Sequence, residues 1–156
     1  MPDRLTKIVT RGGDKGETSL ADGTRLPKDD PRIALIGEVD ELNSWLGVVI
    51  DHGAEGVLKE TLSRAQHDLF DLGADLATVN EAVPALRINQ AQVARLEHEI
   101  DTVNTNLQPL TSFILPGGTP LSAWLHLGRT VARRAERQMT ELAVEEPVNE
   151  AAMQYI

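Results

Sequence analysis

Beyond residue 30, apolar side chains recur along this chain at alternating spacings of four and three residues, the pattern of one buried face on an α-helix. The first run consists of Leu35, Val39, Leu42, Leu46 and Val49. Asp30 before Pro31 marks its start, because aspartate caps a helix N-terminus and proline fits the first helical position. Gly53 ends the run, so the pattern predicts a first helix between these two signals.

Three later runs repeat this pattern and predict three more helices. Their apolar positions are Leu58, Leu62, Ala65, Leu69, Leu72 and Leu76; then Val93, Leu96, Ile100 and Val103; then Leu121, Leu125, Gly128, Ala132, Ala135, Met139 and Leu142. Asn89, with Gln92 as a weak capping box, opens the third helix, and Thr119 before Pro120 opens the fourth. A short fifth helix is expected near Pro147. It reaches Ile156 without a stop signal, so we expect the natural chain to continue.

Consecutive runs of this kind predict an all-α, five-helix bundle whose helices run up and down with near-antiparallel neighbours. A length of 156 residues suits a single domain over 1–156, with the bundle over 31–156. Aromatic residues make up only 3% of the chain, so aliphatic side chains must fill the core, which favours helix-on-helix packing. Residues 1–30 are polar and Gly-rich with little periodicity, and we treat them as a separate N-terminal segment.

Composition excludes several functional classes. The chain has no cysteine, which excludes disulfides, thiolate zinc sites and cysteine nucleophiles. A net charge of −9 argues against broad nucleic-acid binding, which needs a basic face. No stretch approaches the roughly 18 apolar residues of a membrane span, and residues 1–7 lack the apolar run of a signal peptide. We therefore expect a cytoplasmic protein that binds neither nucleic acid nor membrane.

Against this acidic background, four arginines and a glutamate crowd into residues 129–137. They are Arg129, Arg133, Arg134, Glu136 and Arg137. On a helix, Arg129, Arg133 and Glu136 or Arg137 share one face because they are spaced by four and three. Clustered cations repel one another, and a bound anion relieves that repulsion. Because a guanidinium can bind phosphate in a bidentate way, the cluster predicts a phosphate-like ligand.

Residues 10–19 have the composition of a phosphate-binding loop. Gly12 and Gly13 let backbone N–H groups approach phosphate oxygens, and Lys15 adds a positive charge. Further hydroxyl groups come from Thr10, Thr18 and Ser19. The segment matches neither a Walker A loop nor the dinucleotide fingerprint, and an ordinary surface turn explains the same composition. Lys28, two residues before the helix cap, is not explained by capping.

Other positions allow two interpretations. Asp40 flanks the apolar face of the first helix, either as the partner of an arginine or on a solvated face. Asp68, Asp71 and Asp75 follow one stripe of the second helix, which is more typical of a solvated face than of a metal site. Phe113, in an apolar loop before the fourth helix, either fills the core or forms a wall against a flat ligand.

The histidines do not indicate a metal site. A di-iron bundle needs Glu-x-x-His pairs on facing helices. The residues three positions before His52, His67, His98 and His126 are not glutamates, so we interpret each histidine as structural.

Five motifs in this order resemble those of the PduO-type ATP:cob(I)alamin adenosyltransferases over nearly the whole chain. They are Thr-x-x-Gly-Asp-Lys-Gly-Glu-Thr at 10–18, Lys-Asp-Asp-Pro-Arg at 28–32, Asp-Glu-Leu-Asn-Ser at 40–44, the segment 113–118, and Arg-Arg-Ala-Glu-Arg at 133–137. Each motif alone is weak, but five in order on a helical background are specific. The chain departs from the family pattern at Arg11 and Gly12, where lysine and threonine are expected.

The resemblance implies a ferritin-like bundle that assembles as a homotrimer with active sites between subunits. It implies transfer of the 5′-deoxyadenosyl group of ATP to cob(I)alamin, with Mg²⁺ bridging the phosphates. A cobalamin reductase or a product-accepting enzyme would be a further partner. No metal ligands from the protein are expected.

The resemblance also implies residue roles. In one subunit the ATP contacts would be Thr10, Arg11, Gly12, Gly13, Lys15, Thr18, Ser19 and Lys28. In its neighbour they would be Arg133, Arg134, Glu136 and Arg137. Asp40 would pair with Arg129 across the interface, and Phe113 would lie under the corrin ring.

Two other functions share part of this pattern. A non-catalytic regulator that binds ATP or polyphosphate on the same bundle would use the N-terminal segment and the arginines but would not need Phe113. A structural helical adaptor would use the arginines in salt bridges between subunits and would bind no nucleotide. Corrinoid-dependent chemistry distinguishes the enzyme from both.

Overall fold

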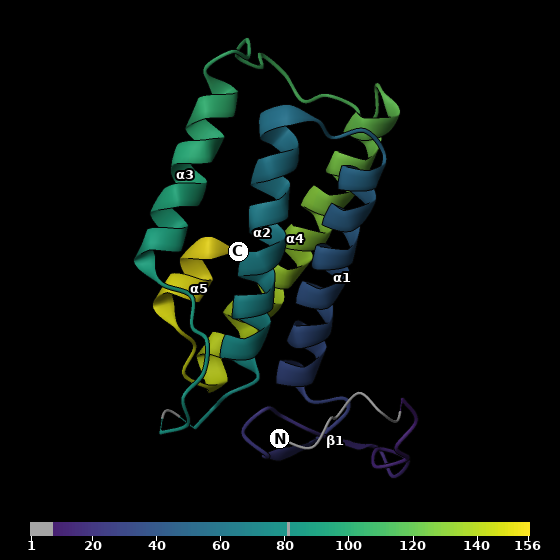
Figure 1. Ribbon diagram of the computed structural model, residues 1–156, viewed down its shortest axis with the longest axis vertical. Helices are drawn as coiled ribbons and strands as arrows, with labels where there is room; N and C mark the ends of the chain where they lie inside the picture. The colour runs from purple at the N-terminus through teal and green to yellow at the C-terminus, as the bar shows by residue number, and fades with distance from the viewer. Residues whose placement is uncertain (1–7, 81) are drawn as a thin grey trace.

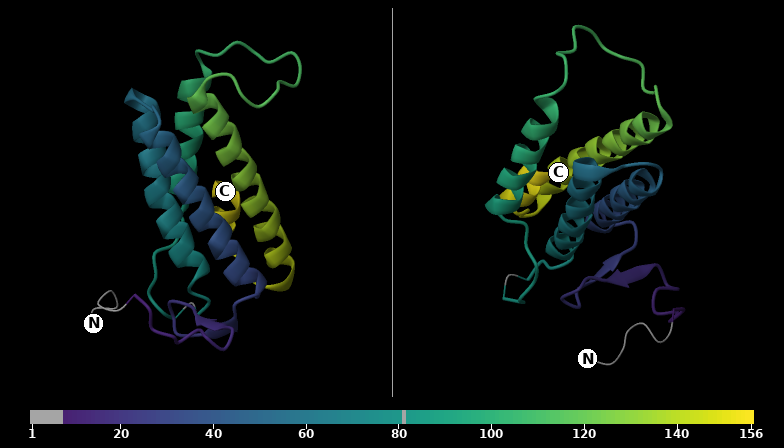
Figure 2. Two further views of the ribbon diagram at one scale, coloured as in Figure 1. Left: turned by 90° about the vertical axis from the view of Figure 1, so that its right-hand side faces the viewer. Right: turned by 45° about the horizontal axis from the view of Figure 1, so that its top comes forward.

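A computed structural model of the chain describes residues 8–80 and 82–156 and is mainly helical (Figures 1 and 2). The helices are α1 (Pro31–Asp51), α2 (Gly56–Leu76), α3 (Gln90–Asn104), α4 (Pro120–Glu145) and α5 (Glu150–Tyr155). Successive helices α1 to α4 alternate in direction, which confirms the predicted up-and-down arrangement. α1 packs against α2 and α4, whereas α3 packs against α2 and α5. Within the described ranges, no helix is long and apolar enough to cross a membrane.

The N-terminal segment contains a feature that the all-α prediction missed. Strand β1 (Glu17–Ser19) pairs antiparallel with β2 (Arg25–Pro27), with Thr18 opposite Leu26. Strands of three residues are too short to give the alternating pattern by which strands are recognised. The hairpin lies at the end of the bundle where α1 begins (Figure 1). The predicted segment 1–30 is seen from residue 8 onward, and its first seven residues lie outside the described ranges.

The predicted starts of the first, third and fourth helices are confirmed, and each has a capping side chain. Asp30 and Thr119 each accept a hydrogen bond from a first-turn N–H group, at 2.8 and 3.2 Å. Asn89 forms a complete capping box with Gln92. These local hydrogen bonds explain why sequence patterns located the three helix starts.

The predicted short fifth helix is present and begins at Glu150, where the side chain of Asn149 caps it by accepting from the Ala151 N–H group at 3.1 Å. One prediction for the third helix is wrong. Ile100 and Val103, expected in the buried face of the third helix, are exposed. The short helix α5 lies beside only the first part of α3, so it leaves the second part uncovered (Figure 1).

The core between α1, α2 and α4 is aliphatic, as the low aromatic content predicted. Its most deeply buried side chains are Leu35, Val39, Val49, Leu72 and Met139. Full burial of each such side chain contributes about 1.5–3 kcal/mol to stability.

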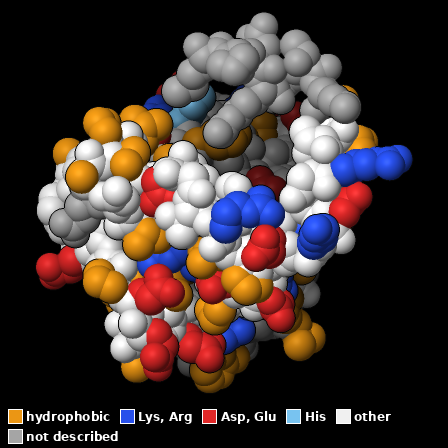
Figure 3. All heavy atoms as spheres, turned by 90° about the horizontal axis from the view of Figure 1, so that it is seen from below, with side chains coloured by type: hydrophobic (Ala, Val, Ile, Leu, Met, Phe, Trp, Pro, Cys, Tyr) orange, Lys and Arg blue, Asp and Glu red, His pale blue; other side chains and the backbone are white. Residues whose placement is uncertain are grey.

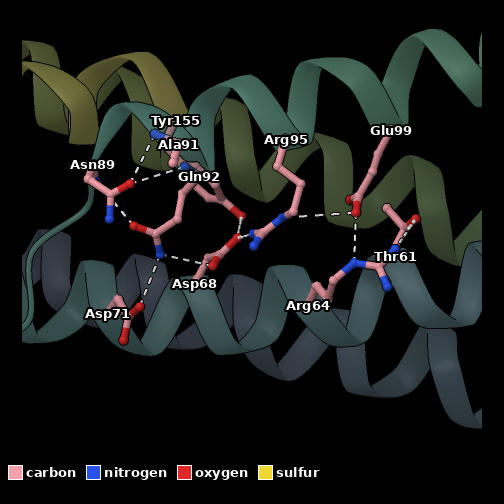
Figure 4. Close-up of polar contacts among 10 residues, drawn as sticks. All are labelled: Thr61, Arg64, Asp68, Asp71, Asn89, Ala91, Gln92, Arg95, Glu99 and Tyr155. Atoms are coloured by element: carbon pink, nitrogen blue, oxygen red, sulfur yellow. Dashed lines mark hydrogen bonds and ion pairs between the residues drawn. The ribbon is translucent and has the colours of Figure 1, made fainter.

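One polar cluster joins α2 to α3 and α5, with Asp68 at its centre (Figure 4). The Asp68 side chain is buried, although its position predicted a solvated face, so that prediction is wrong. Its carboxylate pairs with Arg95 and accepts hydrogen bonds from Gln92 Nε2 at 2.9 Å and from the Tyr155 hydroxyl at 2.7 Å. Burial and the bond to Asp68 raise the pKa of Tyr155 well above its usual range, so its hydroxyl stays a donor.

Asp75 makes a second buried polar cluster at the end of α2, and it too contradicts the predicted solvated face. Its carboxylate pairs with Arg87 at 2.7 Å and accepts from the Ile88 N–H group at 3.0 Å. Asn149 Nδ2 donates to the same carboxylate at 2.6 Å. Asp75 therefore ties the α2–α3 connection to the start of α5.

Replacing Asp68 by alanine is expected to destabilise the fold by about 3 kcal/mol, because it leaves the Tyr155 hydroxyl and Arg95 without their buried partner. Urea denaturation followed by circular dichroism measures the change. Asp71→Ala is the matched control, since Asp71 is half-buried and accepts only from Gln92, at 3.0 Å. It should cost less than about 1 kcal/mol. Equal losses in the two variants would contradict the central role of Asp68.

Candidate functional site

The β1–β2 hairpin holds several of the predicted ligand-binding residues on one small frame. Antiparallel pairing places Ser19 opposite Arg25. The Arg25 guanidinium donates to Ser19 Oγ at 3.1 Å and to the Gly12 carbonyl at 3.3 Å, and it pairs with Glu17 at 3.3 Å. One side chain thus links both strands to the preceding Gly-rich turn. Arg25 was not among the predicted site residues.

Lys28 lies directly against Gly13. A Cβ atom at Gly13 would come within 2.9 Å of Lys28 Cε and Nζ and within 3.0 Å of the Glu17 carbonyl oxygen, so a side chain there would displace the end of Lys28 and crowd that carbonyl. The Lys28 N–H group donates to the Gly16 carbonyl at 2.8 Å. These contacts hold the Lys28 ammonium group beside the Gly-rich turn, and an ammonium group suits a phosphate.

The remaining predicted residues of the segment surround this turn. Thr10 Oγ1 accepts from the Gly12 N–H group at 3.4 Å. Arg11 has a φ of +57°, a left-handed conformation that is uncommon for a residue other than glycine. Lys15 is exposed and Thr18 is partly buried. The structure thus links Thr10, Gly12 and Ser19 through hydrogen bonds and places Lys28 against Gly13.

The arginine cluster on α4 separates into two directions. Arg129, Arg133, Glu136 and Arg137 are exposed along one face, as the spacing predicted. Arg134 instead turns toward α1, where its Nε donates to Glu38 at 2.5 Å and its guanidinium also pairs with Glu41. The hydrogen bond to Glu38 raises the pKa of Arg134. Four arginines in sequence thus give three outward cations and one helix–helix contact.

Asp40 and Phe113 are both exposed. Asp40 lies on α1, on the outside of the bundle. Phe113 is 106% exposed, so the interpretation in which it fills the core is wrong for this chain. Its loop also exposes Leu110, Ile114 and Leu115. An apolar surface of this kind is typical of a site that another molecule covers.

A cavity of about 470 Å³ opens beside the Phe113 loop. It is lined by Pro116, Pro120, Ala123, Trp124, His126, Leu127 and Thr130. Behind it, Trp124 stacks on Trp45 of α1 with ring centroids 5.4 Å apart. This end of the bundle is therefore apolar and aromatic, unlike the hairpin end.

The hairpin and the Phe113 loop lie at opposite ends of the bundle (Figures 1 and 2). α1 runs between these ends with 21 residues, which span about 30 Å. Seen from the hairpin end, basic and acidic side chains are intermixed (Figure 3). Anion binding there must therefore come from particular groups, such as Lys28, rather than from a broad positive surface.

Comparison with known proteins decides the family. Residues 8–156 match the family model described as "Cobalamin adenosyltransferase". The chain belongs to the cobalamin adenosyltransferase family. It is 49% identical to the corrinoid adenosyltransferase of Mycobacterium leprae, over 88% of this chain and 75% of that protein. It is 44% identical to the cobalamin adenosyltransferase of Cupriavidus metallidurans, over 100% of this chain and 83% of that protein.

A solved structure from the same family has the same fold as this chain. It is a PduO-type ATP:corrinoid adenosyltransferase from Lactobacillus reuteri, a variant with one phenylalanine replaced by alanine, in complex with cobalamin and ATP. The two chains are 40% identical with a TM-score of 0.87, and the match covers 96% of this chain and 84% of that one.

Sequence reasoning missed Asp22, the residue that attaches the hairpin to the bundle of this adenosyltransferase homologue. Its carboxylate accepts from the backbone N–H groups of Thr24 at 2.9 Å, Val79 at 3.0 Å and Asn80 at 3.1 Å. The first of these bonds is a local turn signal that sequence shows, but the other two join positions far apart in the chain. The bonds to Thr24 and Asn80 contribute most to lowering the Asp22 pKa from 3.8 to about 2.

This shift predicts a pH dependence. Because the folded-state pKa is the lower one, Asp22 stabilises the fold above pH 3.8 and loses that effect as the pH falls toward 2. The difference in unfolding free energy between wild type and Asp22→Asn should therefore be constant above about pH 4 and shrink below it. Asp101→Asn, at an exposed position of α3, is the charge-matched control. An Asp22 carboxyl that titrates at 3.8 by NMR would contradict this assignment.

Proposed function

We propose that this chain transfers the 5′-deoxyadenosyl group of ATP to cob(I)alamin, yielding adenosylcobalamin and triphosphate. The observation that carries the proposal is the family match over residues 8–156. The exposed Lys28, Arg133 and Arg137 support it as cations suited to an anionic ligand. The relatives support it, because they are named corrinoid or cobalamin adenosyltransferases and the match covers 75% and 83% of their length.

The reaction needs little side-chain chemistry. Co(I) of the corrinoid donates an electron pair to C5′ of ATP, so that the cobalt–carbon bond forms while the C5′–O bond breaks. The triphosphate leaves with the electron pair of the broken bond. No proton moves at the reacting carbon, so no general base is required. Alignment of the two substrates is then the main task of the protein and can contribute about 7–11 kcal/mol.

We assign stabilisation of the negative charge on the departing triphosphate to cations of the hairpin segment and of α4. Lys28, held against Gly13, and the outward Arg133 and Arg137 are placed on exposed surfaces where phosphate oxygens can reach them. The remaining contacts that we assign to ATP are Thr10, Arg11, Gly12, Lys15, Thr18, Ser19 and Glu136. Because Arg134 already binds Glu38, we assign it to supporting the helix face rather than to a phosphate.

Mg²⁺ would enter with ATP. The described residues contain no group of three or more histidine and carboxylate side chains that would hold a metal ion by themselves. A Mg²⁺ ion that arrives with ATP would take most of its ligands from phosphate oxygens and water, as this ion commonly does, and so would not need such a group. When bound, it would neutralise charge on the triphosphate, while Lys28 and the arginines orient the phosphates.

We assign Phe113 to contact with the corrinoid. A fully exposed aromatic ring costs solvation free energy, which a flat apolar ligand such as a corrin ring would recover. We assign to it the exclusion of water and of the lower axial ligand from cobalt.

The layout supports an assembly of several copies. Because the hairpin and the Phe113 loop lie at opposite ends of one chain, an active site that uses both must take them from different copies. We therefore propose a ferritin-like homotrimer with sites between subunits, in which Asp40 of one copy pairs with Arg129 of the next. A cytoplasmic location and supply of Co(I) by a reductase complete the proposal.

Replacing Arg133 by alanine should lower kcat/KM for ATP by about 10² or more, because a charged donor to the leaving group is lost. The KM for the corrinoid should change little. The measurement is an anaerobic assay with chemically reduced cobalamin, ATP and Mg²⁺, following the loss of Co(I) absorbance.

Lys59→Ala, which removes an exposed cation from α2, is the control and should retain wild-type rates. Unaltered ATP kinetics in the Arg133 variant would remove that residue from the site. ATP binding by the wild-type chain without any conversion of cob(I)alamin would favour the regulator instead.

Phe113→Ala should slow turnover by at least about tenfold, which corresponds to about 1.4 kcal/mol, and leave the KM for ATP nearly unchanged. The reason is that the ring would act on the corrinoid and not on the nucleotide. Leu107→Ala, which truncates another exposed apolar side chain of the same connection, is the control in the same assay. If both variants turn over like wild type, Phe113 has no part in catalysis.

A further inference from the structure

The nucleotide-binding hairpin is too small to hold its own position. Each strand has three residues, and an isolated two-stranded hairpin is marginally stable in water. Most of its side chains are exposed, so it gains little from burial. Its orientation relative to the bundle must therefore come from a few specific contacts.

Those contacts gather at the turn between the strands. Leu20 is buried, and the Ala21 N–H group donates to the Ala77 carbonyl just after α2, at 2.9 Å. Next to it, one carboxylate oxygen of Asp22 accepts from both the Val79 and the Asn80 N–H groups. The other oxygen of Asp22 closes the hairpin turn itself through Thr24. Asp22 is thus bonded to the hairpin and to the bundle at once.

The same hairpin and the Gly-rich turn before it carry the groups assigned to ATP. Arg25 bonds to Ser19 and to the carbonyl of Gly12, and Lys28 lies against Gly13. These contacts make residues 12–28 one connected unit. Any rotation of the hairpin about its turn would therefore move the hydroxyl, backbone and ammonium groups together.

We propose that Asp22 is a positioning residue for ATP, because its carboxylate fixes the hairpin on the α2–α3 connection in the orientation that the triphosphate requires. The proposal rests on the proposed function of the hairpin as an ATP-binding element. Asp22 itself touches no substrate. Its effect is preorganisation, which strengthens binding by removing the cost of ordering the hairpin when ATP arrives.

The test compares Asp22→Ala, Asp22→Asn and the charge-matched control Asp101→Asn with wild type. In the anaerobic assay, Asp22→Ala should raise the KM for ATP by at least about fivefold, with kcat at saturating ATP and the KM for cob(I)alamin within about twofold. Asp22→Asn keeps one carbonyl acceptor and should fall between wild type and alanine. Amide hydrogen exchange at Val79 and Asn80, which reports the contact itself, should accelerate in both Asp22 variants and not in the control.

Each outcome has one meaning. Faster exchange with an unchanged KM for ATP overturns the positioning role and leaves the proposed function intact. Equal losses for ATP and for the corrinoid, or a general loss of folded signal in circular dichroism, make Asp22 merely structural and also overturn it. A wild-type chain that binds no ATP in calorimetry refutes the ATP role of the hairpin, and the positioning role falls with it.

Discussion

Two carboxylates buried on one helix are the constraint on which much of this structure depends. Asp68 and Asp75 of α2 are each 4% exposed, and a buried carboxylate is costly unless charged and hydrogen-bonded partners surround it. Those partners come from α3, from the α2–α3 connection and from the start and end of α5. Apolar residues of the same segments, such as Ile88, Val93 and Ala152, also pack in the core. Satisfying the two charges therefore helps to place three segments.

The position of the candidate site depends on the same α2–α3 connection. Asp75 fixes Arg87 and Ile88 at the end of the α2–α3 connection, and Asp22 binds Val79 and Asn80 at its beginning. The hairpin is therefore attached to a connection that is itself anchored by a buried charge. The position of this exposed hairpin thus depends on carboxylates that lie outside its own strands.

The sequence predicted features that depend on contacts between neighbouring residues and missed features that depend on contacts between residues far apart in the chain. The caps at Asp30, Asn89 and Thr119 act within one helical turn, so their patterns located three helix starts. Asp68 looked like a surface residue because its partners, Gln92 and Tyr155, lie 24 and 87 positions away. Composition and spacing marked the members of the candidate site, and the family motifs gave them their roles. Asp22 was missed because it binds Val79 and Asn80, far away in the chain. Arg25 was missed because no motif encodes its contacts within the hairpin segment.

The arginines of α4 show that the spacing of cations along a helix, more than their number, decides which of them remain exposed. Successive residues on a helix point about 100° apart, so neighbours in sequence face different environments. Arg133 is exposed, whereas Arg134 meets Glu38 and Glu41 of α1. The carboxylates of α1 thus neutralise one arginine and leave the outward ones uncompensated by that helix. A chain of net charge −9 can in this way present a local cationic face, because its acidic residues pair selectively with the inward cation.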